Sequence, residues 1–399
     1  MTVLIIGNGV AGISLARELR ARESSPEKLA VTVLARENYD YYSRIRLPEV
    51  FGGESMSAEL LALYKPSWYA QRRIDVQLGK DVSAVDRARR RVLLSSGDEI
   101  GYDVLALAVG AEPARPLLPG SYIPGVFTLR EYDDAARIRA ASLARPGPAV
   151  VVGGGLLGLE AARHLQLEGA ARVTVLEAAP RLLPRQLDSG GAALLERLLS
   201  AMGVETVTSA RLTAFEGRDR LEGIAFEAGG AARRIDACLA VLSMGVRPRI
   251  GLAKAAGLAT ARGVVVDRFL RTSDSSIYAL GDCAEFGGVA LCIIPAALEE
   301  APCCAQAILG DESRPYAGTV PSNTLKVAGI DLFSAGAVER REGMEELALE
   351  PGERRYERYL FEDGALAGAI VIGSRARARA VAPLVGKAAT AADVEALPS

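Results

Sequence analysis

Short apolar runs alternate with amphipathic stretches along the chain, and one order of predicted elements occurs twice. The first occurrence has a strand and helix over 2–20, a strand over 30–34, a meander over 84–100 and a buried strand over 102–110. The second occupies 149–245 and again ends in an apolar strand followed by glycine. Apolar strands separated by helical stretches are typical of parallel sheets. Each half of the chain is therefore predicted to form an α/β unit built from βαβ.

The remaining segments differ from this repeat. An aromatic and basic loop over 39–48 is too polar for a core element and too aromatic for a simple linker. Proline-rich residues 113–119 indicate a domain boundary, and from about residue 314 a β-rich pattern with one late helix fits neither half. Further helices are predicted over 59–73, 131–144, 188–202 and 295–309. The pattern thus predicts two similar α/β domains and a third, small α+β domain.

Each half opens on the same glycine motif, G-x-G-x-x-G, placed between an apolar strand and a helix. The glycines of the two copies are Gly7, Gly9 and Gly12, then Gly153, Gly155 and Gly158. The first glycine makes a tight turn, the second lets the backbone approach a pyrophosphate, and the third lets the helix pack closely on the strand. The anion then lies at a helix N-terminus, where free N–H groups and the helix dipole favour it. Two copies in matching contexts predict two dinucleotide sites.

The composition is that of an ordinary globular protein and removes several classes of function. Of 399 residues, 50% are hydrophobic and 24% charged, and the formal net charge is −2. This charge gives no electrostatic basis for binding nucleic acid or an anionic membrane. No apolar run reaches the ~20 residues that span a bilayer, and the N-terminal run lacks the basic start of a signal peptide. We therefore expect a cytoplasmic protein.

Cysteine and histidine usage argues against disulfide and metal chemistry. The five cysteines are odd in number and scattered, and no C-x-x-C pair occurs among them. The only histidine, His164, excludes histidine-rich metal sites and any Ser-His-Asp triad that does not use it. Lacking a cysteine or carboxylate partner, His164 is predicted to be structural, as are the adjacent Cys303 and Cys304. No metal site is predicted.

Acidic residues after the second strand of each motif help to assign the two sites. Glu177 ends this strand in the second copy, where a carboxylate accepts hydrogen bonds from a ribose and repels a 2′-phosphate. NADH is therefore favoured over NADPH, although Arg181, four residues on, keeps NADPH open. In the first copy the strand leads to Arg36 and Glu37, so the carboxylate comes two positions late. Glu37 is the candidate ribose ligand there.

Several segments together resemble one enzyme family. They are Gly7 to Gly12, Tyr42 to Arg44, Ala108 to Gly110, Phe127 to Arg130, Gly153 to Glu160, Leu183 to Asp188, Met244 to Pro248, Ile277 to Glu285 and Leu325 to Asp331. These segments resemble two-dinucleotide-binding flavoprotein reductases with a glutathione-reductase-like fold. Within that group they are most similar to NADH:rubredoxin reductases and to the NADH/FAD module of assimilatory-type nitrite reductases. The resemblance implies two Rossmann-like domains and a small C-terminal α+β domain.

The resemblance also implies how the cofactors divide the chain. It assigns an FAD-binding domain to 1–113 and 246–312, an NAD(P)H-binding domain to 114–245, and an interface domain to 313–399. The positions implied to contact FAD are Gly7, Gly9, Val10, Ala11, Gly12, Arg36, Glu37, Arg44, Val82, Ala108, Gly110, Arg130 and Asp282. Those implied to contact NADH are Gly153, Gly155, Leu156, Leu157, Gly158, Glu160, Glu177 and Gly245.

Two residues are implied to act at the reacting rings. Arg44 stands where related peroxidases and NADH oxidases have a redox-active cysteine, and a cation near the flavin would stabilise its anionic reduced form. Glu160 follows the second motif by two residues, and in the family this glutamate orients the nicotinamide. A favourable charge at a helix N-terminus is the alternative for Glu160, worth roughly 0.3–1 kcal/mol. A solvated surface arginine is the alternative for Arg44.

The predicted function is an NADH-dependent FAD reductase that passes electrons to a separate acceptor. The implied acceptors are rubredoxin, ferredoxin or a nitrite-reductase subunit. Alternatives are an NADH oxidase or peroxide reductase, disfavoured by the arginine at position 44, and a flavin redox sensor without enzymatic activity, disfavoured by the intact second motif. The arginines Arg375, Arg377 and Arg379 are the predicted docking site for an acidic carrier, with a solvated charged face as the alternative.

Overall fold

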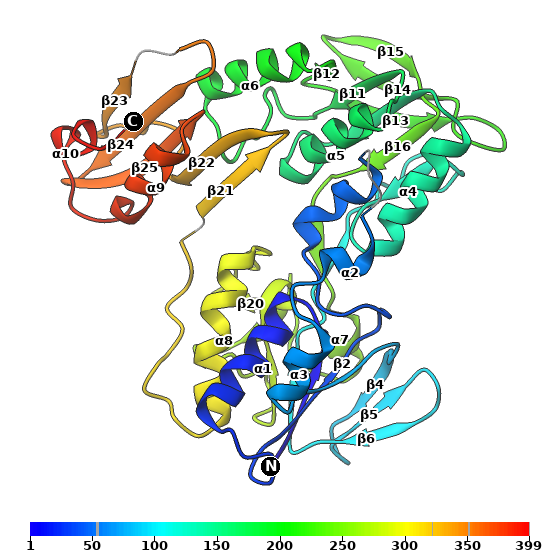
Figure 1. The fold of residues 1–399 in the computed structure, drawn as a ribbon, viewed down its shortest axis with the longest axis vertical. Helices are drawn as coiled ribbons and strands as arrows, with labels where there is room; N and C mark the ends of the chain where they lie inside the picture. The colour runs from blue at the N-terminus through cyan, green and yellow to red at the C-terminus, as the bar shows by residue number, and fades with distance from the viewer. Residues whose placement is uncertain (53–55, 321, 350–351, 399) are drawn as a thin grey trace. The chain divides into compact units, whose positions relative to one another are not determined.

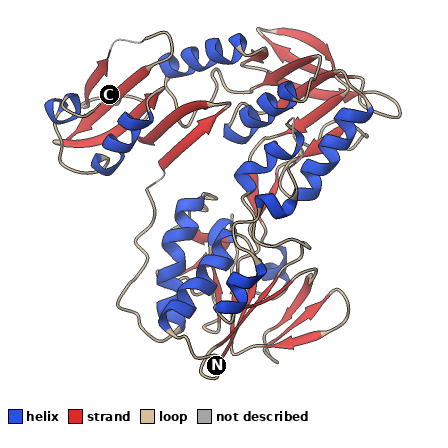
Figure 2. Cartoon of the chain, in the orientation of Figure 1, coloured by secondary structure: helices blue, strands red, loops and turns tan. Residues whose placement is uncertain are grey.

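The computed structural model describes residues 1–52, 56–320, 322–349 and 352–398, and side chains are described outside 322–327. Its contacts divide the chain into two compact units, each a mixture of helices and strands (Figure 2). Unit 1 comprises Met1–Ser43, Ser57–Glu112 and Val246–Thr319. Unit 2 comprises Arg44–Met56, Pro113–Gly245 and Val320–Ser399. Each unit contains one of the two glycine motifs.

Unit 1 is built on a five-stranded parallel sheet with the order β19-β7-β1-β2-β3. Its strands are β1 Thr2–Ile6, β2 Ala30–Leu34, β3 Asp75–Gln77, β7 Val104–Leu107 and β19 Ile277–Ala279. The predicted strand over 30–34 is confirmed. Helices α1 (Val10–Arg22) and α8 (Ile294–Ile308) pack against each other. Val3, Leu4 and Ile5 are fully buried, since β1 is central; burying each such side chain contributes roughly 1.5–3 kcal/mol.

The predicted helix over 59–73 is wrong as a continuous element. The structure has two short helices, α2 (Ala58–Leu61) and α3 (Pro66–Gln71). Pro66 explains the break, because proline is tolerated in the first turn of a helix and not in its interior. Ala62 between them is extended and pairs with Tyr42 in an isolated bridge. The predicted meander is an antiparallel sheet of β4 (Val82–Asp86), β5 (Arg91–Leu94) and β6 (Glu99–Gly101).

The remaining elements are short, and all but β8 lie between residues 246 and 286. Two short strand pairs form, one by β8 and β17 and one by β18 and β20. The bounds of these elements are β8 Ala111–Pro113, β17 Val246–Pro248, α7 Gly251–Ala255, β18 Val264–Val266, η2 Gly281–Cys283 and β20 Ala284–Phe286. The turn η2 follows β19 directly, so it lies at the carboxyl edge of the parallel sheet, where ligands of such folds bind.

Unit 2 repeats this architecture with a second five-stranded parallel sheet, of order β12-β11-β10-β16-β9. Its strands are β9 Val126–Thr128, β10 Pro148–Val152, β11 Arg172–Leu176, β12 Val204–Val207 and β16 Leu239–Leu242. The helices are η1 Arg44–Phe51, α4 Tyr132–Ala144, α5 Leu156–Leu167 and α6 Ser189–Ala201. The segment 206–207, predicted to belong to a meander, lies instead in the parallel edge strand β12.

A three-stranded antiparallel sheet completes this part of unit 2. It consists of β13 (Arg211–Glu216), β14 (Gly223–Ala228) and β15 (Ala231–Asp236). The sequence did not predict β15, because its residues are alanines and arginines that are mostly exposed and so lack an apolar alternation.

The C-terminal segment of unit 2 is an antiparallel sheet of order β21-β22-β25-β24-β23 with two short helices. The strands are β21 Ser322–Val327, β22 Ile330–Gly336, β23 Glu345–Leu349, β24 Tyr356–Glu362 and β25 Ala365–Ile372. They are followed by α9 Arg375–Val381, η3 Ala382–Leu384 and α10 Ala391–Glu395. This agrees with the predicted α+β class, except that two α-helices follow the sheet where one was expected.

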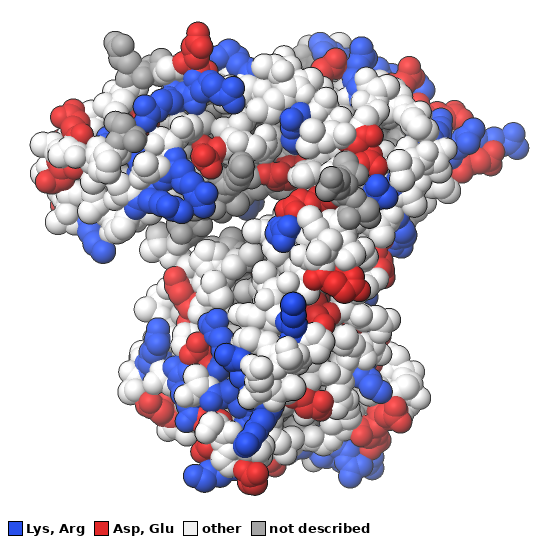
Figure 3. Space-filling view, in the orientation of Figure 1, with Lys and Arg blue, Asp and Glu red and all other residues white. Residues whose placement is uncertain are grey.

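Two further findings concern the described residues. No described helix is both long and apolar enough to cross a membrane. The residues that the structure describes also contain no group of three or more histidine, cysteine or acidic residues placed to hold a metal ion. Basic and acidic side chains are interspersed over the face shown in Figure 3.

Candidate functional site

The first glycine motif forms a turn in which two of its positions accept only glycine. Gly7 has φ +113°, and a Cβ there would lie 2.2 Å from the carbonyl oxygen of Ala108. A Cβ at Gly12 would lie 1.9 Å from the carbonyl oxygen of Gly7. Gly9 is different, because no described atom lies within 4 Å of its Cβ position. The open space at Gly9, directly before α1, is what close approach of a pyrophosphate requires.

The second motif reproduces this geometry position by position. Gly153 has φ +114° and its Cβ would lie 2.2 Å from the carbonyl oxygen of Ser243, while a Cβ at Gly158 would lie 2.1 Å from the oxygen of Gly153. Gly155 again has no described atom within 4 Å of its Cβ position, and it caps α5. The residues Leu156 and Leu157 form the first turn of α5 and are half-buried. Both turns therefore fit the pyrophosphate of a dinucleotide.

Glu177 is held against the second glycine turn by two backbone groups. Its carboxylate accepts hydrogen bonds from the N–H of Gly154 at 2.6 Å and the N–H of Ala179 at 2.7 Å. These bonds fix the carboxylate at the end of β11, beside the turn that would hold the pyrophosphate. This is where the ribose next to that pyrophosphate would lie.

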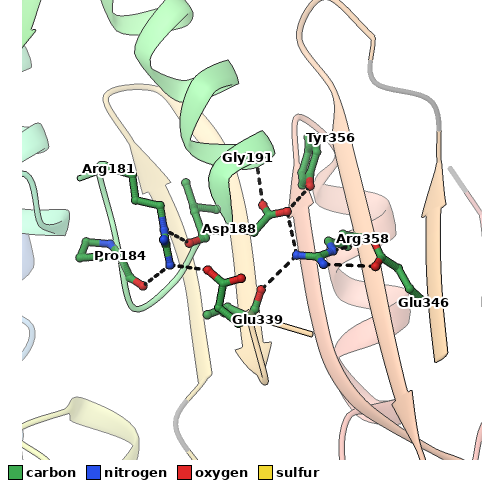
Figure 4. A network of polar contacts seen from close by, with 10 residues as sticks. Arg181, Pro184, Asp188, Gly191, Glu339, Glu346, Tyr356 and Arg358 are labelled. Atoms are coloured by element: carbon green, nitrogen blue, oxygen red, sulfur yellow. Dashed lines mark hydrogen bonds and ion pairs between the residues drawn. The ribbon is translucent and has the colours of Figure 1, made fainter. Parts of the chain in front are cut away.

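Arg181, the residue that could have bound the 2′-phosphate of NADPH, contacts other groups of the protein. Its guanidinium donates to the carbonyl of Leu187 at 2.9 Å and forms an ion pair with Glu339 at 2.5 Å (Figure 4). The ion pair neutralises the charge that a 2′-phosphate would need, which supports the preference for NADH.

Glu37, the candidate ribose ligand of the first motif, has a hydrogen-bond partner within the protein. The hydroxyl of Tyr42 donates to the carboxylate of Glu37, whereas the side chain of Arg36 is exposed. Asn8, between the first two glycines of the motif, is 8% exposed and donates to the carbonyl of Tyr39 at 2.8 Å. Thus the aromatic loop is tied to the glycine turn and to the candidate ribose ligand.

The remaining FAD positions of unit 1 surround the same turn or lie on the adjoining sheet. Ala108 contacts Gly7 as described, and Gly110 has φ +71° with its carbonyl accepting from the N–H of Arg249 at 3.0 Å. Val10 and Ala11 begin α1. Val82 begins β4 and is half-buried. Asp282 lies in η2, half-buried, one residue after Gly281.

Gly281 connects this turn to a residue that the sequence analysis missed. A Cβ at Gly281 would lie 2.6 Å from the Cβ of Ala11, so η2 packs directly on the glycine motif. The N–H of Gly281 donates to Oε2 of Glu300 at 2.6 Å, and Glu300 is only 5% exposed. Burial raises the pKa of Glu300 to about 7. The signal that could have identified Glu300 from the sequence is an acidic residue within the apolar stretch that forms α8.

Arg44 and Arg130, both implied to lie against FAD, contact each other in unit 2. Nη1 of Arg44, the first residue of η1, donates to the backbone carbonyl of Arg130 at 2.6 Å. Arg130 directly precedes Glu131, the N-cap of α4. The structure therefore brings the two arginines together, and their contact with flavin stays a prediction.

Glu160 on α5 contacts the C-terminal segment of unit 2. Its carboxylate accepts from the N–H of Ala328, in the turn between β21 and β22, at 2.9 Å. Gly245, also implied to contact NADH, has φ +90° and its carbonyl accepts from the N–H of Ala114 at 2.9 Å. The orienting role of Glu160 toward nicotinamide stays a prediction, and its hydrogen bond to Ala328 adds a structural role.

His164 was predicted to lack a carboxylate partner, and the structure places one carboxylate near its ring. Its Nε2 lies 3.7 Å from the carboxylate of Glu160, one helical turn earlier. Burial lowers the pKa of His164, so the ring is neutral near pH 7. A Cβ at Gly52 would lie 2.0 Å from Nδ1, which shows that the residue after η1 packs tightly on this ring. These contacts support the predicted structural role.

The arginines predicted as a docking site divide into two kinds. Arg377 is 2% exposed and forms an ion pair with Glu357 at 2.9 Å, so it belongs to the interior of the C-terminal segment. Arg375 and Arg379 are exposed. The prediction for Arg377 is therefore wrong, because i and i+2 positions on a helix face different sides.

Comparisons with known proteins agree with this geometry. Residues 1–306 match the family described as pyridine nucleotide-disulphide oxidoreductase, and 321–387 match the C-terminal domain of rubredoxin NAD+ reductase. The chain is 31% identical to NAD(P)H nitrite reductase of Bacillus subtilis (strain 168) over 390 residues, which cover 97% of this chain and 47% of that protein. It is 36% identical to rubredoxin-NAD(+) reductase of Pseudomonas putida over 285 residues, covering 71% of this chain and 72% of that one.

A solved structure matches over nearly the full chain. The ferredoxin reductase for the CYP199A2 system from Rhodopseudomonas palustris superposes with a TM-score of 0.85 at 28% identity, covering 98% of this chain and 96% of that one. The chain spans about half the length of the nitrite reductase named above. With two matched glycine turns and a family match over residues 1–306 of 399, the chain belongs to the pyridine nucleotide-disulphide oxidoreductase family.

Proposed function

We propose that this protein is an NADH-dependent FAD reductase that passes electrons to a separate redox protein. The observation that supports this proposal most directly is the duplicated glycine turn. There is open space for a ligand at Gly9 and at Gly155, whereas a side chain at the flanking glycines would collide with backbone atoms. Acceptors of the rubredoxin, ferredoxin or nitrite-reductase-subunit class are the partners, in line with the names of its relatives. A cytoplasmic location goes with this proposal.

The roles of the residues follow from their contacts. The turn at Gly7–Gly12 and the turn at Gly281–Asp282 hold FAD in unit 1, and the turn at Gly153–Gly158 with Glu177 holds NADH in unit 2. When bound, FAD supplies the redox chemistry, taking a hydride from NADH and releasing electrons to the acceptor. The protein contributes binding, orientation and electrostatics, with Arg44 stabilising negative charge on the flavin and Glu160 orienting the nicotinamide. The domain division at 113, 245 and 312 is part of this proposal.

The test begins with the purified full chain reconstituted with FAD. Under anaerobic conditions, added NADH is expected to remove the visible flavin absorbance, and NADPH is expected to do so more slowly. Oxidised rubredoxin, ferredoxin or an isolated nitrite-reductase subunit is then added, and the returning flavin absorbance identifies the acceptor. A chain that takes up no FAD would overturn the proposal.

Two outcomes would instead support the alternatives. Rapid steady consumption of NADH with air as the sole acceptor, at roughly 10 per second or more, would indicate an oxidase. A bound flavin that NADH does not reduce would indicate a redox sensor.

A further inference from the structure

Glu300 is a buried carboxylate beneath the turn that carries Asp282. It lies on α8, the helix that packs against α1, which begins in the first glycine motif (Figure 1). Its exposed fraction is 5%, and Oε2 accepts the N–H of Gly281 at 2.6 Å. The neighbouring Glu299 is exposed and accepts from the hydroxyl of Thr319 instead. The two adjacent carboxylates therefore have different surroundings.

Glu300 contacts the turn that packs on the first glycine motif, where FAD is proposed to bind. Gly281 adopts φ +74°, and a Cβ there would meet Ala11 at 2.6 Å. The turn is thus fixed on one side by Glu300 and on the other by the glycine motif, and Asp282 follows it immediately. We propose that Glu300 is a positioning residue for flavin, which holds the Gly281–Asp282 turn and weakens FAD binding when it loses its proton. This inference rests on the proposed function.

The surroundings of Glu300 disfavour its ionised form. Burial is the main cause, and the negative charges of Asp282 and Glu299 add to it, while the hydrogen bond from Gly281 opposes it; together they raise the pKa of Glu300 to about 7. The other titratable groups that interact with it are thiols and a phenol, whose pKa values are themselves raised by burial. They are Cys283, Cys303, Cys304 and Tyr316.

Protonation and hydrogen bonding can act separately here. A neutral carboxyl group still offers its carbonyl oxygen to the N–H of Gly281, so the turn stays held in both states. Ionisation adds a negative charge near Asp282, and a dinucleotide brings a negative pyrophosphate to the adjoining glycine turn. Like charges in a poorly solvated region repel, so binding of FAD and ionisation of Glu300 oppose each other.

The experiment measures the dissociation constant of FAD from the flavin-free full chain by quenching of flavin fluorescence at pH 6 and pH 8. For the wild type we expect the constant to rise about fivefold between these pH values. For Glu300→Gln, which keeps an acceptor for Gly281 and cannot ionise, we expect equal values at both. Glu299→Gln is the matched control; it removes only a minor contribution to the raised pKa of Glu300 and leaves Glu300 able to ionise, so a rise of the constant with pH is expected to remain.

The inference is overturned if the wild-type constant does not change with pH, or if Glu300→Gln retains the change. If Glu300→Gln does not fold, calorimetry of FAD binding to the wild type at pH 7 in buffers of different ionisation enthalpy decides instead. Net proton uptake on binding is then expected, and no uptake overturns the inference. Absence of FAD binding in every protein would overturn the proposed function as well, whereas tight binding without pH dependence would overturn only the role of Glu300.

Discussion

The glycines of the two dinucleotide-type turns serve two different purposes, one in folding and one in ligand binding. Substitutions can distinguish these two roles. Gly153 is needed for the fold, because its positive φ and the nearby oxygen of Ser243 exclude a side chain. Gly155 leaves its Cβ direction free in the protein itself. A residue whose side chain would meet only a ligand can be changed with little effect on folding and a large effect on binding.

Gly155→Ala is therefore expected to fold, at a cost below about 1 kcal/mol for an alanine at an N-cap, and to raise the KM for NADH by at least roughly tenfold. Gly153→Ala should lose about 1–3 kcal/mol from backbone strain alone. Thermal melting and steady-state kinetics measure the two effects. Gly251→Ala, at another open glycine, is the control. Normal NADH kinetics in Gly155→Ala would contradict a dinucleotide at this turn.

Glu177 is the residue expected to set the choice of nicotinamide dinucleotide. In Glu177→Gln the repulsion of a 2′-phosphate is lost together with a charged ribose contact. We expect kcat/KM for NADH to fall about tenfold, equivalent to about 1.4 kcal/mol, and the NADH-to-NADPH ratio to shrink. Glu205→Gln, an exposed residue on the adjacent strand β12, should change neither value. An unchanged ratio in Glu177→Gln would remove its role in specificity.

The raised pKa of Glu300 also predicts how the stability of the flavin-free chain depends on pH. Its pKa rises from 4.5 to about 7 on folding, so the folded state binds the proton more tightly than the unfolded state. Its contribution to stability is complete below pH 4.5 and is lost as pH rises through 7. With about 1.4 kcal/mol for each pKa unit, the loss is at most about 3 kcal/mol.

Melting temperatures of wild type and Glu300→Gln at pH 5.5 and pH 8 measure this effect. The wild type should lose more stability than the variant on going to pH 8. Equal losses in the two proteins would show that Glu300 keeps its ordinary pKa in the folded chain.

At the level of elements, Asp188 is one of the residues that join the second α/β domain to the C-terminal segment within unit 2. Asp188 is the N-cap of α6, accepting from the N–H of Gly191 at 3.0 Å. Its other carboxylate oxygen accepts from the hydroxyl of Tyr356 and from Arg358, the latter at 2.9 Å, and both partners lie on β24 (Figure 4). Asp188 and Arg358 are almost fully shielded from solvent, so this pair is a buried one.

Asp188→Ala is expected to destabilise unit 2 by about 1–3 kcal/mol, because it removes the acceptor of the Tyr356 hydroxyl and one of the two carboxylates of Arg358, and it also removes a helix cap. Asp188→Asn keeps an acceptor for Gly191 and should lose less. Limited proteolysis is the measurement, with faster cleavage expected in the C-terminal segment of Asp188→Ala. Glu346→Ala, which leaves Asp188 paired with Arg358, provides a comparison. Equal proteolysis of Asp188→Ala and wild type would contradict the role of this contact.

At the scale of the whole molecule, the net charge of −2 gives little long-range steering, so a redox partner must be attracted locally. The exposed arginines on α9 are the remaining candidates, since Arg377 is buried. Electrostatic complementarity acts mainly on the association rate and fades with salt.

Replacing Arg375 and Arg379 by glutamate is expected to slow electron transfer to an acidic carrier about tenfold at low ionic strength, with the difference shrinking at high salt. Flavin reduction by NADH should not change. The matched control replaces Arg218 and Arg220, both exposed in the same unit, by glutamate. A loss of rate that is equal in both double variants would assign the effect to net charge and not to α9.

Much of the fold could be predicted because its determinants are local. Apolar runs such as 30–34 predicted strands at their observed positions, and each glycine motif predicted a strand, a turn and a helix. The family could be predicted for the same reason, since the motifs that carry the resemblance are contiguous in sequence. The errors occurred where a local rule was weak or overlooked, as with Pro66 inside a predicted helix and the arginine-rich strand β15.

The sequence by itself determined that there are two dinucleotide-type turns and which glycines build them, because each motif and its flanking strand and helix are contiguous in the chain. Only the tertiary structure decided what the polar residues between the motifs contact. It placed Glu300 under Gly281, Asp188 against Arg358, Arg181 against Glu339, and Arg377 in the interior. These pairs are separated by 19 to 170 residues in the chain, and no local periodicity encodes such distances. Charge state and partner are therefore properties of the folded protein, while the turn is a property of the sequence.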